Sequence, residues 1–242
     1  MSRPPLTVSI AVPALNEASE IGATLASALN QLGPAEVFVV DGGSTDGTPE
    51  VAARSGVRVL DAPRGRARQM NAGAAAARGD VLLFLHADTR LPPGALAAVR
   101  DALADPAVAG GCFRTTFDVA ASPWMRLWQA RLWMRWHRLA FGDRAPFVRR
   151  WAFDAAGGVP DQPIFEDLDL VRRVRRHGRF VFVDADVVTS GRRFRANGAL
   201  GQQARNLALW LGWNAGIAPS RLKRFYPDGA GSGRPPGASS PG

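Results

Sequence analysis

Acidic side chains follow three separate apolar runs in this 242-residue chain. Glu17 comes shortly after the run at 8–12, Asp41 directly after the run at 36–40, and Asp88 shortly after the run at 81–85. Carboxylate oxygens bind divalent cations and accept hydrogen bonds from hydroxyl groups such as those of a ribose. Each acid taken alone could instead turn the chain or cap a helix. Three acids at the ends of strands of one sheet predict a site for a divalent cation together with a nucleotide.

The elements that must position these residues alternate along the chain. Short apolar or β-branched runs are separated by helical patterns, which is typical of βαβ units and a mostly parallel sheet, an α/β fold. Ligands of such sheets sit outside the carboxyl ends of the strands. The expected strands are Val8–Val12, Glu36–Val40, Val57–Leu60, Val81–Leu85, Val108–Phe117, Phe147–Val148 and Phe180–Val183, with a strand pair near Val187–Ser190. The expected helices cover about 21–32, 48–56, 64–77 and 93–103, begin again at Glu166, and follow Gly198.

The composition is that of a folded globular chain, with 46% hydrophobic and 21% charged residues. The single cysteine, Cys112, cannot form an intramolecular disulfide, and no stretch reads as a signal peptide or a spanning helix, so we expect a cytoplasmic protein. The net charge of +9 is uneven, because residues 1–120 carry 10 basic and 12 acidic side chains and residues 121–242 carry 20 and 9. The second half should therefore face an anionic small molecule or a membrane surface; motif spacings for nucleic-acid binding are missing, and no nucleic-acid partner is expected.

A basic, tryptophan-rich pattern at 123–141 predicts a further helix. One interpretation is a peripheral contact with the inner face of the cell membrane, with the indoles at the level of the headgroups. The other is a helix packed on the sheet, with arginine stems covering its apolar rim.

The chain lacks the sequence motifs of three other classes of protein that bind nucleotides or phosphate groups. The first strand is followed by Pro-Ala-Leu-Asn-Glu rather than by Gly-x-Gly-x-x-Gly, which disfavours a dinucleotide oxidoreductase. Gly43 stands where a phosphatase with an aspartyl nucleophile at Asp41 would need a second acid, and there is no Walker loop.

The spaced motifs as a set resemble family 2 glycosyltransferases of the GT-A fold, and the resemblance covers the chain from Val8 to about Tyr226. The chain also resembles a compact subgroup of this family, described as arsenosugar-biosynthesis or diaponeurosporenoate-type (carotenoid) glycosyltransferases. The resemblance to the subgroup lies in Leu-His-Ala-Asp-Thr (85–89) and in the motifs around Gly142, Phe147 and Thr189. The family motifs are Val-Pro-Ala-Leu-Asn-Glu (12–17), Val-Val-Asp-Gly-Gly-Ser-Thr-Asp-Gly-Thr (39–48), Arg66-x-x-Gln69-x-Asn71-x-Gly73, Phe-Leu-His-Ala-Asp-Thr (84–89) and Phe-Glu-Asp-Leu-Asp-Leu (165–170).

The resemblance implies a single Rossmann-like GT-A domain over 1–226, with a nucleotide-binding half at about 8–117 and an acceptor half, helical toward its end, at about 118–226. The tail at 227–242 is rich in Pro, Gly and Ser and is expected to be disordered.

The resemblance also implies that the donor is a nucleotide-sugar, specifically a UDP-sugar, and it implies which residues bind this donor. Pro13, Leu15 and Glu17 would line the base pocket, Asp41 would bind the uracil or ribose, and Gly43 and Ser44 would let the backbone approach. Arg66, Gln69 and Asn71 would face the nucleotide, Arg192 and Arg193 would reach the diphosphate unless they form a solvated surface pair, and Asp88 would hold Mg²⁺ or Mn²⁺.

Asp167 is by resemblance the general base of a single, inverting displacement, and Glu166 would orient it or the acceptor. Without the other motifs, Asp167 would simply neutralise arginines farther along its helix. For His86, two roles stay open: a metal ligand or a packing residue. Arg144 stands where relatives usually carry glutamine. The acceptor would be a small metabolite or a lipid such as a carotenoid acid. Two alternatives stay open: a catalytically idle, membrane-associated binding module of this fold, and a sugar nucleotidyltransferase, which would want a basic loop where Glu17 stands.

Overall fold

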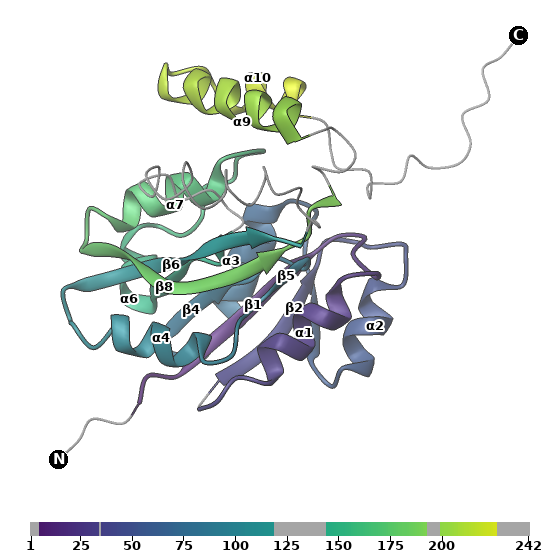
Figure 1. Cartoon of the computed structure of the whole chain (residues 1–242), viewed down its shortest axis with the longest axis vertical. Helices are drawn as coiled ribbons and strands as arrows, with labels where there is room; N and C mark the ends of the chain where they lie inside the picture. Colours follow the sequence, from purple (N-terminus) through teal and green to yellow (C-terminus); the bar gives the residue numbers. More distant parts are fainter. Residues whose placement is uncertain (1–4, 34, 119–143, 193–198, 227–242) are drawn as a thin grey trace, which may run out of the picture.

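One mixed sheet of eight strands organises the computed structural model, which describes residues 5–33, 35–118, 144–192 and 199–226 (Figure 1). The strand order is β3-β2-β1-β4-β7-β6-β8-β5. The strands are β1 (Val8–Ala14), β2 (Ala35–Asp41), β3 (Arg58–Asp61), β4 (Val81–Phe84), β5 (Thr89–Arg90), β6 (Val108–Phe117), β7 (Phe147–Arg149) and β8 (Arg179–Thr189).

The strand directions bring four strand ends to one edge of the sheet. β1 pairs in parallel with β2 and β4, and β6 pairs in parallel with β8. β7 lies between β4 and β6 and is antiparallel to both, so β6 and β8 again point the same way as β4. The last residues of β1, β2, β4 and β8 therefore share one edge, called the C-terminal edge below.

Helices cover both faces of the sheet, as their buried residues show. α1, α2 and α4 pack on one face through residues such as Leu25, Ala52 and Leu96, whereas α3, α6 and α7 pack on the other through residues such as Met70, Phe153 and Leu170. The helices are α1 (Ile21–Leu29), α2 (Thr48–Arg54), α3 (Arg66–Ala76), α4 (Ala95–Ala102), α6 (Arg150–Ala155), α7 (Glu166–Val174), α9 (Ala199–Asn214), α10 (Pro219–Leu222) and the 3-10 helix η3 (Lys223–Phe225).

The α/β fold class is confirmed, while several boundaries differ from the expectation. β8 is one strand of 11 residues, where the sequence predicted separate strands at Phe180–Val183 and near Val187–Ser190. The expectation was split because Asp184 and Asp186 interrupt the apolar pattern of β8. Both of these acids are exposed and pair with Arg114 of β6. The short elements β5 and α6 were not expected.

Three sequence predictions lie outside the described residues: the tryptophan-rich helix at 123–141, the role of Arg193, and the tail at 227–242. Within the described residues, no helix combines the length and the apolar character needed to cross a membrane.

Two consecutive glycines in β6 allow β7 to fit beside it. A Cβ atom on Gly110 would lie 2.6 Å from the carbonyl oxygen of Phe147, and one on Gly111 would lie 2.5 Å from the carbonyl oxygen of Val181. Both neighbours are backbone atoms of adjoining strands, so they cannot rotate away. The reversed strand that restores the common direction therefore depends on these glycines.

Gly110→Ala is expected to lower the free energy of unfolding by about 2 kcal/mol or more, because the new methyl group forces strands apart. Urea denaturation followed by circular dichroism measures the change. The matched control is Gly201→Ala in α9, where nothing lies within 4 Å of the added Cβ. That replacement should be neutral or stabilise by about 0.5–1 kcal/mol, since alanine favours helix over glycine. Equal effects of the two variants would contradict this account.

Candidate active site

The loops that follow β1 and β2 are hydrogen-bonded to each other. The Asn16 N–H donates to Ser44 Oγ at 2.9 Å, and the Asn16 side-chain oxygen accepts from the Thr45 N–H at 2.8 Å. The Glu17 N–H donates to Thr48 Oγ1 at 2.8 Å. Asn16 adopts a left-handed backbone with φ +54°, a conformation that asparagine tolerates better than most residues. The two loops thus form one continuous wall at the C-terminal edge.

The Asp46 side chain forms further hydrogen bonds between these two loops. Its carboxylate accepts from the Ala18 N–H at 3.0 Å and from the Thr48 N–H at 3.1 Å. Burial alone would raise the pKa of Asp46, but the hydrogen bonds from the Thr48 hydroxyl and these backbone groups lower it below its usual value. The carboxylate is therefore ionised at neutral pH and keeps the two loops together.

Asp41, the last residue of β2, is buried and shapes its own loop. One carboxylate oxygen accepts from the N–H groups of Gly43 at 2.9 Å and Ser44 at 2.8 Å, and the other accepts from the Ser44 hydroxyl at 2.5 Å. Gly43 has φ +87°, which disfavours a side chain, and a Cβ there would meet nothing within 4 Å. The loop backbone at Gly43 is thus open to close approach.

Gln69 and Asn71, expected to face a nucleotide, direct their amide groups to the chain itself. Gln69 is 4% exposed, and its Nε2 donates to the carbonyl oxygens of Ala14 at 2.7 Å and Val40 at 2.8 Å. The Asn71 side chain donates to the Val159 carbonyl at 2.8 Å and accepts from the Val159 N–H at 2.9 Å. In this structure Gln69 fastens the ends of β1 and β2 together, and Asn71 holds the loop after α6.

Arg192, which follows β8, lies among three carboxylates. Its guanidinium is 2.5 Å from Glu17, 3.5 Å from Asp88 and 4.0 Å from Glu20. Burial alone would lower the pKa of Arg192, but the hydrogen bond to Glu17 and the three negative charges raise it. The C-terminal edge therefore has a place where acidic side chains converge on a cation.

Asp88 and Ser190 are joined through the backbone, because the Ser190 N–H donates to the Asp88 carbonyl at 3.0 Å. The Ser190 hydroxyl is buried and has no hydrogen-bond partner in the part of the chain that the structure describes. Ser190 lies in the motif around Thr189, and the sequence alone does not indicate it as a site residue. His86 is half-buried, two residues before Asp88.

Glu166 and Asp167 begin α7 on the other helical face of the same edge. Both are buried, and Arg66 at the start of α3 lies 3.4 Å from the Glu166 carboxylate. The Asp167 carboxylate accepts from the Leu168 N–H at 2.8 Å. Both acids lie in the first turn of α7, at the positive end of its helix dipole.

Phe165, immediately before these acids, has a left-handed backbone with φ +63°. For a bulky residue this conformation is a genuine outlier, and such strain concentrates at functional sites. The Phe165 ring stacks on Trp213 of α9, with ring centroids 5.2 Å apart.

The structure thus brings most of the sequence-predicted residues to one edge. Pro13 and Leu15 lie half-buried at the end of β1, beside the wall formed by the two loops. In the described residues, no three His, Cys, Asp or Glu side chains form a complete ligand set for a metal ion. A cation bound at Asp88 would therefore need oxygen ligands from its substrate as well.

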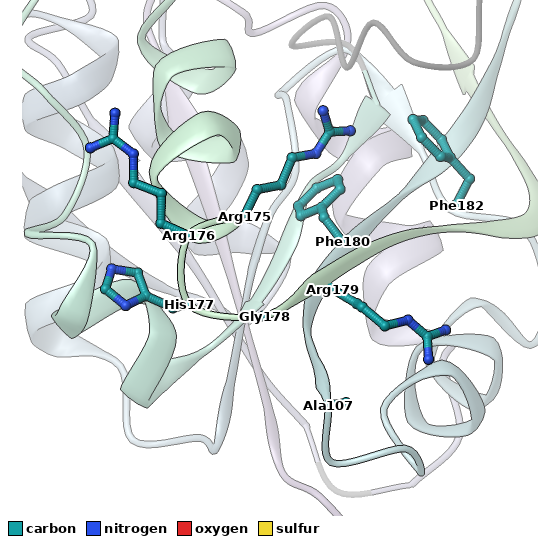
Figure 2. A pocket seen from close by; sticks show the side chains of 8 residues that line it. All are labelled: Ala107, Arg175, Arg176, His177, Gly178, Arg179, Phe180 and Phe182. Atoms are coloured by element: carbon teal, nitrogen blue, oxygen red, sulfur yellow. The ribbon is translucent and has the colours of Figure 1, made fainter.

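A basic groove lies at the opposite edge of the sheet, where α7 ends and β8 begins (Figure 2). The Arg175 guanidinium reaches over the Phe180 ring at 5.5 Å, and Arg179 pairs with Asp105 at 2.7 Å. Cations at a helix C-terminus complement its dipole. The groove is separated from the acidic edge by the length of α7.

Comparison with known proteins gives a family match and a set of structural likenesses. The family model described as Glycosyl transferase family 2 matches residues 9–158. An uncharacterised protein of Mycobacterium tuberculosis is 38% identical over 107 residues, which are 42% of this chain and 34% of that protein. The beta-monoglucosyldiacylglycerol synthase of Synechocystis is 28% identical over 193 residues, which are 70% of this chain and 40% of that enzyme. The chain thus spans between a third and two fifths of the length of these curated relatives.

Two solved structures share the fold. The mannosyltransferase PcManGT from Pyrobaculum calidifontis, in complex with GDP-Man and Mn²⁺, has a TM-score of 0.63 at 23% identity, covering 86% of this chain and 65% of that chain. TarS 1-349 of S. aureus, in complex with UDP-GlcNAc, has a TM-score of 0.63 at 17% identity, covering 76% of this chain and 58% of that chain. These likenesses support the GT-A assignment of the fold.

Gln69→Leu is expected to lower the free energy of unfolding by about 2 kcal/mol, because it leaves buried carbonyl oxygens without a donor. Denaturant titration of the purified variant measures the loss. Arg68→Ala is the matched control on the same helix: Arg68 pairs with Asp161 at 3.0 Å, but both side chains are more than half exposed. That exposed pair should contribute less than about 1 kcal/mol. A Gln69→Leu variant as stable as the control would show that this amide does not fasten the strand ends.

Proposed function

Since the chain belongs to glycosyl transferase family 2 and is a glycosyltransferase, we propose that it transfers a hexosyl group from a nucleotide-diphosphate sugar to a small-molecule or lipid-like acceptor. The reaction proposed is a single displacement that inverts the configuration at the anomeric carbon. Asp88, Arg192 and Ser190 act on the donor side, and Asp167 acts on the acceptor side.

The observation that carries the donor side is the convergence of Arg192, Asp88 and Ser190 at the ends of β4 and β8. A diphosphate offers oxygens that accept hydrogen bonds from a guanidinium and from a hydroxyl. Arg192 has the fork geometry for this contact, and the Ser190 hydroxyl is a buried donor that lacks an acceptor among the described residues. The wall formed by the loops after β1 and β2, with Pro13, Leu15 and Asp41, lies beside it and offers a surface for the base and the ribose.

The same residues fit a divalent cation, because carboxylate and phosphate oxygens are the ligands that Mg²⁺ and Mn²⁺ prefer. Asp88 would hold the ion, and the acidic surroundings that now attract the Arg192 guanidinium favour a cation there. The bound ion would stabilise the negative charge that develops on the departing diphosphate. The structural neighbour PcManGT carries Mn²⁺, which supports a divalent metal here.

On the acceptor side, Asp167 takes the proton of the acceptor hydroxyl group as its oxygen attacks the anomeric carbon. The new carbon–oxygen bond forms while the bond from that carbon to the diphosphate oxygen breaks, and the electron pair leaves with the nucleoside diphosphate. Glu166, held by Arg66 at 3.4 Å, keeps the start of α7 and therefore Asp167 in position. Asp167 is 6% exposed, so its carboxylate is shielded from bulk water.

The choice of substrates rests on likeness alone. We propose a UDP-sugar as donor, and GDP-sugars are the alternative because the two structural neighbours hold one of each kind. The Leu-His-Ala-Asp-Thr motif supports the arsenosugar or carotenoid subgroup, and the lipid product named for the Synechocystis relative supports an amphipathic acceptor. His86 is a packing residue or an additional metal ligand in this proposal.

Donor binding is expected to depend on the metal and on Asp88. Isothermal calorimetry against UDP, GDP, UDP-glucose and GDP-mannose, with and without Mn²⁺, should give metal-dependent binding of one nucleotide class. Asp88→Ala should weaken it at least tenfold, because the diphosphate and the ion then lose their protein carboxylate. Asp101→Ala, at an exposed position on α4, is the control and should bind as the wild type does. Failure of every nucleotide to bind under both metal conditions would refute the proposed function.

Turnover is expected to depend on Asp167. With the donor that calorimetry identifies, release of nucleoside diphosphate with water as acceptor can be followed. Asp167→Asn should lower kcat about 10²–10⁴-fold with little change in donor affinity, because only proton transfer is lost. Asp169→Asn is the matched control, since Asp169 lies on the same helix and pairs with Arg173 at 3.2 Å. Equal kcat values in the two variants would exclude Asp167 as the base.

A further inference from the structure

Large apolar side chains are exposed along α9 and the segment that follows it. Leu207 and Leu211 of α9 are 42% and 52% exposed, Ile217 is 43% exposed, and Phe225 is 70% exposed. Leu207 and Leu211 are one helical turn apart, so they lie on the same face of the helix. In Figure 1, α9 and α10 form the outermost layer of the described structure, beyond α7.

The same segment is exclusively basic among its charged residues. Residues 199–226 contain Arg205, Arg221, Lys223 and Arg224 and no aspartate or glutamate. Arg221 and Arg224 are exposed. An apolar surface beside unbalanced positive charge complements an anionic surface that also has an apolar interior.

On one side, the exposed stripe of α9 adjoins an arginine row that begins on α7. The Arg172 guanidinium donates to the Asn214 side chain at 2.7 Å and lies 3.6 Å from the centre of the Trp213 ring. Asn214 is three residues after Leu211 and seven after Leu207, so it continues their face of α9. Arg175 and Arg176 directly follow the last residue of α7, three and four residues after Arg172, and both are exposed.

On the other side, the stripe adjoins α10. A Cβ on Gly212 of α9 would lie 3.0 Å from the Leu222 side chain, and Leu222 packs with Leu209 in one buried cluster. This packing places α10 and η3, with Arg221 and Arg224, against a different side of α9 from the one that Arg172 contacts, because Gly212 and Asn214 lie about 200° apart around the helix. The leucines therefore lie between two basic borders.

We propose that this face docks on an anionic lipid bilayer. The face, called the α9 surface, consists of Leu207, Leu211, Ile217 and Phe225 with the basic borders Arg172, Arg175, Arg176, Arg221 and Arg224. Its four apolar side chains enter the boundary between headgroups and acyl chains, and its arginines pair with lipid phosphates. α9 then lies in the plane of the membrane, since its 16 residues are too few to cross a hydrocarbon core of about 30 Å.

Docking through this face brings the start of α7 close to the bilayer. Phe165, which stacks on Trp213 of α9, directly precedes Glu166 and Asp167. A lipid-like acceptor in the membrane would therefore approach from the side where the proposed base lies. The docking itself does not rest on the proposed function, because it requires neither donor nor turnover.

The test is co-sedimentation of the full chain with vesicles of phosphatidylcholine alone and of phosphatidylcholine mixed with phosphatidylglycerol. We expect binding to the anionic vesicles only, weakened by added salt because the arginine contacts are screened. The double variant Leu207→Gln/Leu211→Gln should lower the partition coefficient at least about tenfold, as two apolar side chains no longer enter the lipid. Arg221→Glu/Arg224→Glu should lower it comparably on anionic vesicles.

Leu29→Gln/Leu32→Gln is the matched control. These two leucines are 47% and 87% exposed, at and just beyond the end of α1, away from the α9 surface. The control should bind vesicles as the wild type does, and thermal denaturation of all variants checks that each is folded.

Three results would overturn the proposal. The first is no binding of the wild type to anionic vesicles. The second is equal binding of the Leu207→Gln/Leu211→Gln variant and the wild type. The third is that light scattering shows a wild-type dimer and a monomeric Leu207→Gln/Leu211→Gln variant, while neither protein binds vesicles. The α9 surface would then be an interface between copies of the chain. Donor calorimetry on the same samples separates these outcomes from a failure of the proposed transferase function.

Discussion

The contact of Arg192 with Glu17 and Asp88 joins the two ends of the fold at the place where the chemistry is proposed. Glu17 follows the first strand and Arg192 follows the last, 175 residues later in the sequence. Without a cation between them, Glu17, Glu20 and Asp88 would repel one another at the edge of the sheet. A half-buried arginine and a divalent ion bound with a diphosphate are two ways to meet the same electrostatic requirement. In the proposed function, Arg192 would therefore share these carboxylates with the incoming metal and phosphates.

The topology of the sheet makes this contact geometrically attainable. β8 can end at the same edge as β1 and β4 only because β7 enters the sheet in the reverse direction between β4 and β6. That arrangement depends on the bare backbone of Gly110 and Gly111, where the neighbouring carbonyl oxygens leave no room for a Cβ. The position of a cationic side chain at the proposed active site is thus linked to two glycines in the middle of the core.

The position of Glu17, Asp41 and Asp88 at one edge was predictable from the sequence because each follows an apolar run, and parallel strands bring such positions together. Glu166 and Asp167 begin a helix, and their proposed roles come from the family motif alone. Gln69 and Asn71 were assigned to the nucleotide because they match a motif of the family that the sequence resembles. Their hydrogen bonds go to the carbonyl oxygens of Ala14 and Val40 and to the backbone of Val159, and local sequence carries no signal for such long-range backbone partners. Ser190 was missed for a related reason, because a serine shows its importance only when burial leaves its hydroxyl without a partner. The continuity of β8 was not predicted, because Asp184 and Asp186 belong to its solvent side and break the apolar pattern between its two ends.

The two sides of the proposed site are held in physically different ways. The donor side is fixed by hydrogen bonds among loops that Asp41, Asp46 and Gln69 fasten to the ends of β1 and β2. On the acceptor side, Phe165 adopts a left-handed backbone that costs about 1–3 kcal/mol, which its surroundings must offset. Its stacking partner Trp213 belongs to α9, and Trp213 is in turn covered by Arg172 of α7. A displacement of α9 would change the contact that supports Phe165 and with it the start of the helix that carries Asp167. The geometry of the proposed base therefore depends on the position of the outermost helix, whereas the geometry of the donor wall depends on the sheet.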